Sequence, residues 1–257
     1  MNDVNKAELI ERLKEGQTLQ DEELKLLFSG ESVYDSKQMQ EICIGLEHNL
    51  DVSIYAILDK NGEPVYDWEQ MSMIREGLES GVSTSIYTVL DKDGKSVYDH
   101  YQMDVIRYGL ENGVDVSKYA ILNKDCRSVY DWSQMQQIRY GLESGFDVSI
   151  YAILDKDGKP VYDYYQMFHI REGLENGEDV SIYAVLNKDG KPVYDGEQMY
   201  AIRIGLEKGE DVSHLLIHDT SESETMRTVN HNSSSLCSDN IDEIFVNNDH
   251  DIQPEAR

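Results

Sequence analysis

The sequence is dominated by a 32-residue repeat that occurs six times with no insertion between copies. The copies begin at Val33, Val65, Val97, Val129, Val161 and Val193. Six copies in strict register indicate one structural element that buries its apolar face against its neighbours in a linear array. A chain of 257 residues built in this way needs no single central core.

The first half of each repeat carries the signals for one long helix. Asp67 is followed three residues later by Gln70, which is the spacing of a capping box at a helix start. Gly81 is a residue type that tolerates the left-handed backbone at a helix end, so the helix is predicted to stop there. The apolar positions between these signals are Met71, Ile74 and Leu78.

The second half of each repeat predicts a short helical turn and then a small β-hairpin or a turned loop. Asp115 precedes Val116 and Ser117 as an N-cap would. An Asp-Gly pair between short apolar runs, as at Asp157 and Gly158, is typical of a hairpin turn. The predicted fold class is therefore mainly α, a six-unit repeat solenoid with a long helix, a short helical turn and a hairpin or loop in each 32-residue unit.

Residues outside the repeats predict two flanking segments. Residues 1–32 contain two short amphipathic stretches, which we interpret as a helical N-terminal cap on the array. The repeats span residues 33–218, and the last of them is truncated. Residues 219–257 are rich in Ser, Asn and Asp and carry too little apolar surface to fold alone, so we expect an acidic disordered tail.

Two positions inside the long helix predict contacts between repeats. Gly77 and its equivalents lie within the helix, where glycine costs about 0.5–1 kcal/mol relative to alanine. We interpret this glycine as room for the backbone of the next repeat. Arg75 lies four residues before Glu79, an unfavourable order within one helix, so we predict a ladder of Arg–Glu bonds between repeats.

The sequence is acidic, with a formal net charge of −27 at pH 7. Direct binding to nucleic acid is disfavoured, because a phosphate backbone requires clustered Lys and Arg. Binding to anionic membrane surfaces is disfavoured for the same reason. A basic protein partner is compatible with this charge.

Sequence signals for export or membrane insertion are absent. The start of the chain is polar and lacks the apolar core of a signal peptide. No apolar run approaches the roughly 18 residues that a membrane-spanning helix needs. Cys43, Cys126 and Cys237 lie in unrelated contexts, so no disulfide is predicted and a cytoplasmic location is expected.

No catalytic, cofactor or metal site is predicted. His214 and His218 have the spacing of a metal-binding pair, but they lie at the frayed end of the array. The segment from Asp155 to Gly158 lacks the spacing of a calcium-binding loop. Phosphate-binding loops and nucleophile elbows are also absent from the sequence. We therefore expect a protein that is not an enzyme.

The positions that differ between repeats form one stripe on the long helix. They are the first, fifth and ninth helical residues, which point away from the apolar stripe. Seven aromatic residues on this stripe are the predicted partner-binding residues: Trp68, Tyr108, Trp132, Tyr140, Tyr164, Phe168 and Tyr200. Exposed rings would be typical of a protein-binding surface, whereas rings packed on a neighbouring hairpin would be structural.

The pattern QMxxIRxGLExGxDVSxYA across residues 33–213 resembles short helical repeats of uncharacterised bacterial proteins, many of them carried on mobile or accessory elements. The present repeat is longer, because it adds a segment of the form LDKDGKPVY. The resemblance implies a bacterial α-helical repeat protein, and it implies no activity.

Together these features predict a non-catalytic repeat scaffold that binds an unidentified protein partner through the variable stripe. An alternative is an acidic decoy that mimics nucleic acid and inhibits a DNA-binding or defence protein. Such a decoy needs acidic residues at regular spacing along one face. Salt-sensitive binding to basic proteins would favour the decoy, and aromatic-dependent binding would favour the scaffold.

Overall fold

The computed structural model describes residues 32–217, so the predicted cap, apart from Ser32, and the predicted tail lie outside the described residues. The chain divides into two compact bodies at Gly113 and Val114. We call the described residues 32–113 the N-terminal half and residues 114–217 the C-terminal half, and each is described by itself.

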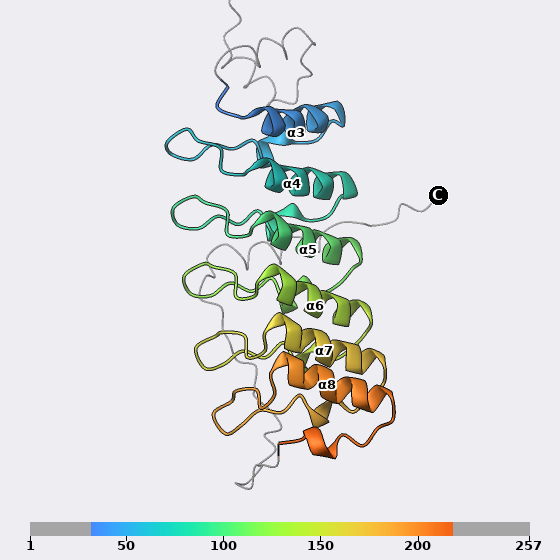
Figure 1. Cartoon of the computed structure of the whole chain (residues 1–257). Coiled ribbons are helices and arrows are strands. Elements are labelled where there is room, and N and C mark those ends of the chain that lie inside the picture. Colours follow the sequence, from blue (N-terminus) through green and yellow to red (C-terminus); the bar gives the residue numbers. More distant parts are fainter. Residues whose placement is uncertain (1–31, 218–257) are drawn as a thin grey trace, which may run out of the picture. The chain divides into compact units, whose positions relative to one another are not determined.

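Each half is a series of long α-helices separated by short 3₁₀ helices (Figure 1). The N-terminal half contains α3 (Ser36–Glu47), η1 (Val52–Ile54), α4 (Trp68–Ser80), η2 (Thr84–Ile86) and α5 (His100–Glu111). The C-terminal half contains η3 (Val116–Lys118), α6 (Trp132–Glu143), η4 (Val148–Ile150), α7 (Tyr164–Glu175), η5 (Val180–Ile182), α8 (Gly196–Glu207) and η6 (Ser213–Leu215).

Consecutive long helices pack against each other within each half: α3 on α4, α4 on α5, α6 on α7 and α7 on α8. No sheet is assigned within residues 32–217. Met71 and Ile74 are fully buried, as their spacing predicts, and Leu78 is half-buried. The predicted mainly α, helical repeat fold is confirmed.

The Asp and Gln of each repeat form the predicted capping box at the start of all six described α-helices. In α4 the Asp67 carboxylate accepts from Gln70 N at 2.8 Å, and Gln70 Oε1 accepts from Asp67 N at 3.0 Å. The structure adds a second role, because Gln70 Nε2 donates to Tyr98 O of the next repeat at 2.8 Å. Equivalent bonds join Gln38 to Tyr66, Gln134 to Tyr162 and Gln166 to Tyr194. One side chain therefore caps its own helix and holds the next repeat.

The glycine inside the long helix makes room for a tyrosine of the same repeat. A Cβ atom built at Gly45 would overlap with Tyr55 Oη, and the same overlap would occur between Gly77 and Tyr87. The Tyr55 side chain is fully buried, and its hydroxyl donates to Glu41 O at 3.1 Å. Our prediction that the backbone of the next repeat lies here is wrong. The glycine instead lets the tyrosine that directly follows the 3₁₀ helix pack against the long helix of the same repeat.

The segment between repeats is a turned loop with one isolated antiparallel bridge, as between Leu58 and Pro64. The Asp59 carboxylate accepts from Asn61 N at 2.8 Å and from Glu63 N at 3.0 Å, and these bonds shape the turn. Gly62 has a φ of 81°, which glycine adopts without strain. In Figure 1 the loops of each half project from the same side of the helices.

Among the cysteines of residues 32–217, Cys43 is free. Among the helices of residues 32–217, none is long and apolar enough to cross a lipid bilayer.

Candidate interaction surface

Five of the seven predicted partner-binding residues have exposed rings. In the C-terminal half, Trp132 and Tyr140 are 40% and 36% exposed, and Tyr164 and Tyr200 are 51% and 43% exposed. In the N-terminal half Tyr108 is 44% exposed. Trp68 and Phe168 are half-buried. The exposed rings are therefore open to solvent on the helices, and complete packing under a neighbouring loop does not describe them.

Cationic side chains lie against several of these rings. In the N-terminal half, Lys37 Nζ lies 4.0 Å from the centre of the Trp68 ring, and Arg107 lies 4.3 Å from that of Tyr108. In the C-terminal half, the Arg171 guanidinium lies 5.4 Å from Phe168 and 5.6 Å from Tyr140. Cations at such distances are attracted by the negative face of an aromatic ring.

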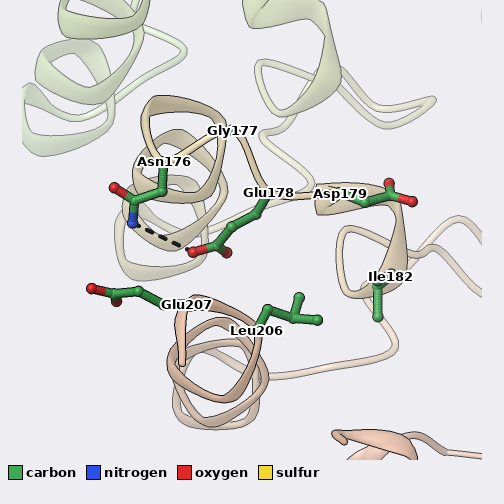
Figure 2. A pocket seen from close by; sticks show the side chains of 7 residues that line it. All are labelled: Asn176, Gly177, Glu178, Asp179, Ile182, Leu206 and Glu207. Atoms are coloured by element: carbon green, nitrogen blue, oxygen red, sulfur yellow. Dashed lines mark hydrogen bonds between the residues drawn. The ribbon is translucent and has the colours of Figure 1, made fainter. Parts of the chain in front are cut away.

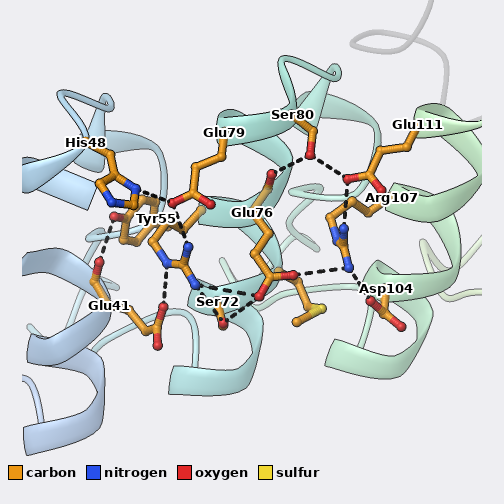
Figure 3. A network of polar contacts seen from close by, with 12 residues as sticks. Glu41, His48, Tyr55, Ser72, Glu76, Glu79, Ser80, Asp104, Arg107 and Glu111 are labelled. Atoms are coloured by element: carbon orange, nitrogen blue, oxygen red, sulfur yellow. Dashed lines mark hydrogen bonds and ion pairs between the residues drawn. The ribbon is translucent and has the colours of Figure 1, made fainter. Parts of the chain in front are cut away.

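Ion pairs connect the helices of the N-terminal half (Figure 3). Arg75 on α4 donates through Nε to Glu41 on α3 at 2.7 Å and through Nη1 to Glu79 at 2.7 Å. Glu79 also contacts His48, the C-cap residue of α3, at 2.7 Å. Burial acts to raise the pKa of Glu79, but the bonds from Arg75 and His48 outweigh it and lower that pKa. The network keeps Glu79 ionised and joins α3 to α4.

The network continues from α4 to α5 through other residues. Arg107 on α5 contacts Glu76 of α4 at 3.1 Å, and it also bonds Asp104 and Glu111 of its own helix. Arg107 Nε is buried and has no hydrogen-bond partner among residues 32–217. The residue 34 positions earlier is Met73, whose side chain offers no strong acceptor, whereas Glu41 fills the equivalent position before Arg75.

The predicted Arg–Glu ladder is wrong in its choice of glutamate. The predicted pairs lie within single helices at i, i+4, such as Arg75–Glu79 and Arg139–Glu143. The arginine also reaches the preceding helix, where Arg75 bonds Glu41, 34 positions earlier, and Arg107 bonds Glu76, 31 positions earlier. The sequence therefore predicted that arginine connects repeats but named the wrong acceptor.

In the C-terminal half the same arginine position meets uncharged acceptors. Arg171 Nε donates to Gln137 Oε1 at 2.9 Å, and Arg203 Nε donates to His169 Nδ1 at 3.4 Å. His169 is 1% exposed, and its Nε2 has no hydrogen-bond partner in the described part of the chain. Burial, and then the charge of Arg203, lower the pKa of His169 to about 4. His169 is therefore neutral at pH 7.

Aromatic rings surround His169. The ring centres of Tyr165, Phe168 and Tyr200 lie 4.4, 5.1 and 5.4 Å from the His169 ring. Tyr165 also covers the start of α8, because a Cβ atom built at Gly196 would overlap with the Tyr165 ring. These contacts form an aromatic cluster that joins α7 to α8, and we call Tyr165, Phe168, His169 and Tyr200 the α7–α8 cluster.

The sequence prediction missed three residues at or beneath the variable stripe: Tyr101, Tyr165 and the buried His169. Tyr101 is 53% exposed, and Tyr165 and His169 belong to the α7–α8 cluster. All three occupy helix positions that also vary between repeats. The second helical residue, for example, is Lys37, Glu69, Tyr101, Ser133, Tyr165 or Glu197. Variation at this position was visible in the sequence and would have extended the stripe.

A shallow pocket of about 500 Å³ lies between the turn that joins α7 to η5 and the end of α8 (Figure 2). Three carboxylates, Glu178, Asp179 and Glu207, are among the residues that line it. Glu178 accepts from Asn176 Nδ2 at 3.4 Å. No group of three or more His, Cys, Asp or Glu side chains in residues 32–217 is arranged to hold a metal ion.

The candidate metal pair from the sequence is only partly described. His214 Nδ1 lies 3.0 Å from Asp211 O, and His218 lies outside the described residues.

Comparisons with known proteins found no matching family model, no similar curated protein and no similar solved structure. The resemblance to short helical repeats of bacterial proteins therefore stays a prediction.

Proposed function

We propose that the protein is a non-catalytic scaffold that binds a protein partner through the variable stripe of its long helices. The observation that carries this proposal is the exposure of aromatic rings at equivalent helix positions, with Trp132, Tyr140, Tyr164 and Tyr200 all in the C-terminal half. Tyrosine and tryptophan are enriched at protein interfaces, because they supply a large contact area at a low cost in conformational entropy.

The constant positions of the repeat stabilise the fold, and the variable positions of the stripe provide the proposed binding surface. Constant residues such as Gln70 and Tyr87 hold the fold through buried contacts. The variable residues of the stripe, such as Tyr140 and Tyr164, are exposed at the surface. This division is typical of repeat proteins, whose stacked units present an extended binding surface.

The alternative function, an acidic decoy that mimics nucleic acid, needs free carboxylates along one face. The helix-end glutamates Glu79, Glu111 and Glu143 are paired with arginines. The capping aspartates, such as Asp67, accept from backbone N–H groups. These pairings support the scaffold over the decoy.

The test is affinity capture from the native host with the wild-type chain and a Tyr140→Ala, Tyr164→Ala, Tyr200→Ala triple variant. We expect specific proteins bound by the wild type to be lost from the triple variant, while circular dichroism shows the same helix content for both. The exposed apolar side chain of Leu58 lies on a loop, so Leu58→Ala is the matched control and should retain the partner.

Two outcomes would contradict the scaffold. Equal capture by the wild type and the triple variant would remove the stripe as the binding surface. Capture that depends on ionic strength and is independent of the aromatic residues would favour the acidic decoy. If the triple variant loses its helix content, the three single variants replace it.

A further inference from the structure

The N-terminal half shows how a cation covers an aromatic ring at a helix start. Trp68 is the first residue of α4, and Lys37 is the second residue of α3. Lys37 Nζ lies 4.0 Å from the centre of the Trp68 ring. The second residue of one helix can therefore place a charge over the first residue of the next.

The same register recurs in the C-terminal half, but without a cation. Tyr165, the second residue of α7, covers Gly196, the first residue of α8. Tyr164, the first residue of α7, has Ser133 at the position equivalent to Lys37. The Ser133 hydroxyl donates to Asp131 Oδ1 at 2.7 Å, and Tyr164 remains 51% exposed. Ser133 thus stands before Tyr164 where Lys37 stands before Trp68. Its side chain is short and bonds the N-cap residue of its own helix, so it places no cation over the Tyr164 ring.

The charged side chains near Tyr164 and the α7–α8 cluster favour the binding of a cation to these rings. Each of α6, α7 and α8 contains no lysine and a single arginine, which pairs with the glutamate four residues later. Glu197 is exposed near Tyr165: burial raises the pKa of Tyr165, and the charge of Glu197 raises it further. The surface therefore combines rings with carboxylates, and the arginines of these helices are already engaged.

We propose that Tyr164, Tyr200 and the adjacent Glu197 form a docking surface for a lysine- or arginine-bearing segment of a protein partner. The inference rests on the proposed scaffold function and names the chemistry of its partner. A partner cation would lie against a tyrosine ring as Lys37 lies against Trp68, and the nearby carboxylate would favour its charge. The acidic chain, with a net charge of −27, would also speed the approach of a basic segment.

The experiment measures binding of labelled synthetic peptides to the full chain at physiological ionic strength. The probes are a lysine peptide spaced by Gly-Ser, the matching arginine peptide and the matching glutamate peptide. We expect both basic peptides to bind and the glutamate peptide not to bind. Tyr164→Leu should weaken binding of the lysine peptide about two- to fivefold, the range for one exposed cation–ring contact. Tyr164→Phe keeps the ring and should bind more tightly than Tyr164→Leu.

A pair of lysine substitutions separates the ring from the overall charge. Ser133→Lys should place an intramolecular cation over Tyr164 and so compete with the peptide. Ser144→Lys adds the same charge at the other end of α6, where Ser144 is exposed and where the sixth repeat carries Lys208. We expect Ser133→Lys to weaken binding several-fold more than Ser144→Lys does, with unchanged helix content in both variants.

Three results would overturn this docking surface. They are no binding of either basic peptide, equal weakening by Ser133→Lys and Ser144→Lys, and full binding by Tyr164→Leu. The last two would show diffuse attraction to an acidic chain. Each of them leaves the scaffold intact if host proteins are still lost from the triple tyrosine variant, so the failure of this inference differs from failure of the proposed function.

Discussion

The N-terminal and C-terminal halves use one arginine position in different chemical environments. Between α3 and α4, Arg75 bonds the carboxylate of Glu41 at 2.7 Å. Between α6 and α7, Arg171 bonds the amide of Gln137, and between α7 and α8, Arg203 bonds the His169 ring. The arginine and the helix packing are the same in both halves, whereas the acceptor differs in charge. The repeat therefore accommodates a carboxylate, an amide or an imidazole as the acceptor at one buried position, and at Met73 it accommodates a residue without a strong acceptor.

The two halves also differ in what lies beside this contact. In the N-terminal half, the carboxylates of Glu76 and Glu79 and the ring of His48 extend the network across the helices (Figure 3). In the C-terminal half, the rings of Tyr165, Phe168 and Tyr200 surround His169. Ion pairs depend on pH and salt, whereas aromatic packing depends on shape, so the halves should respond differently to substitution and to pH.

The largest expected effect is at Glu41. Glu41→Ala leaves the Arg75 guanidinium, whose side chain is only 12% exposed, without its inter-helix carboxylate. Removal of one partner of a buried pair typically costs about 3 kcal/mol or more. We expect faster amide hydrogen exchange in peptides from α3 and α4, measured by mass spectrometry on the full chain.

The matched control is Glu41→Gln, which keeps an acceptor for Arg75 and copies Gln137 in the C-terminal half. Its cost should be about 1 kcal/mol or less, since a neutral hydrogen bond remains. Equal costs for the two substitutions would show that charge alone, and not the presence of an acceptor, stabilises this contact.

The second prediction concerns acid sensitivity of the C-terminal half. His169 has its pKa lowered to about 4 in the folded chain, against an ordinary value of 6.5. Between these values the unfolded state binds a proton that the folded state does not, so stability is lost as the pH falls from 6.5 toward 4. The loss should reach about 2 kcal/mol by pH 5. The loss of stability is measured by amide hydrogen exchange in α7 and α8 between pH 7 and 5, corrected for the intrinsic exchange rates.

His169→Gln is the control for this acid sensitivity. Glutamine at this position keeps an acceptor for Arg203, as Gln137 does for Arg171, but it cannot take up a proton. The variant should lose most of the pH dependence of α7 and α8 above pH 5. The lowered pKa of Glu79 acts only at more acidic pH, because an ordinary glutamate titrates near 4.5. An unchanged pH dependence in His169→Gln would contradict the assignment to His169.

The smallest expected effect is a gain in stability at Met73. Met73→Gln would supply an acceptor for Arg107 Nε, which lacks one among residues 32–217. One such hydrogen bond contributes about 1 kcal/mol. Slower hydrogen exchange in α4 and α5 would measure the gain, and Met73→Leu, which adds no acceptor, should show none. A loss of stability in Met73→Gln would show that the apolar contacts of Met73 outweigh the missing bond.

Contacts that are local in the chain were predictable. The capping box joins residues three apart, such as Asp67 and Gln70, so its spacing is visible in any single repeat. The apolar core positions Met71 and Ile74 follow from the helix period for the same reason. The variable stripe was also visible, since six aligned copies show which positions differ.

Contacts between distant positions were not predictable, because they depend on how one repeat is rotated against the next. Nothing in the sequence around Gln70 predicts that its amide nitrogen also donates to the backbone oxygen of Tyr98, 28 residues later. The glycine at position 45 predicts a close contact. Only the structure shows that Tyr55, which follows η1, fills the space beside it.

The sequence by itself determined the repeat, the helix boundaries and the surface on which variation is concentrated, because these depend on periodicity and on bonds within one helix. The tertiary structure alone decided which residue faces each arginine, since Glu41, Met73, Gln137 and His169 come into position only when successive helices pack. The tertiary structure also decided which aromatic rings are exposed to solvent. Tyr164 is exposed because the neighbouring Ser133 is short, whereas Trp68 lies under Lys37.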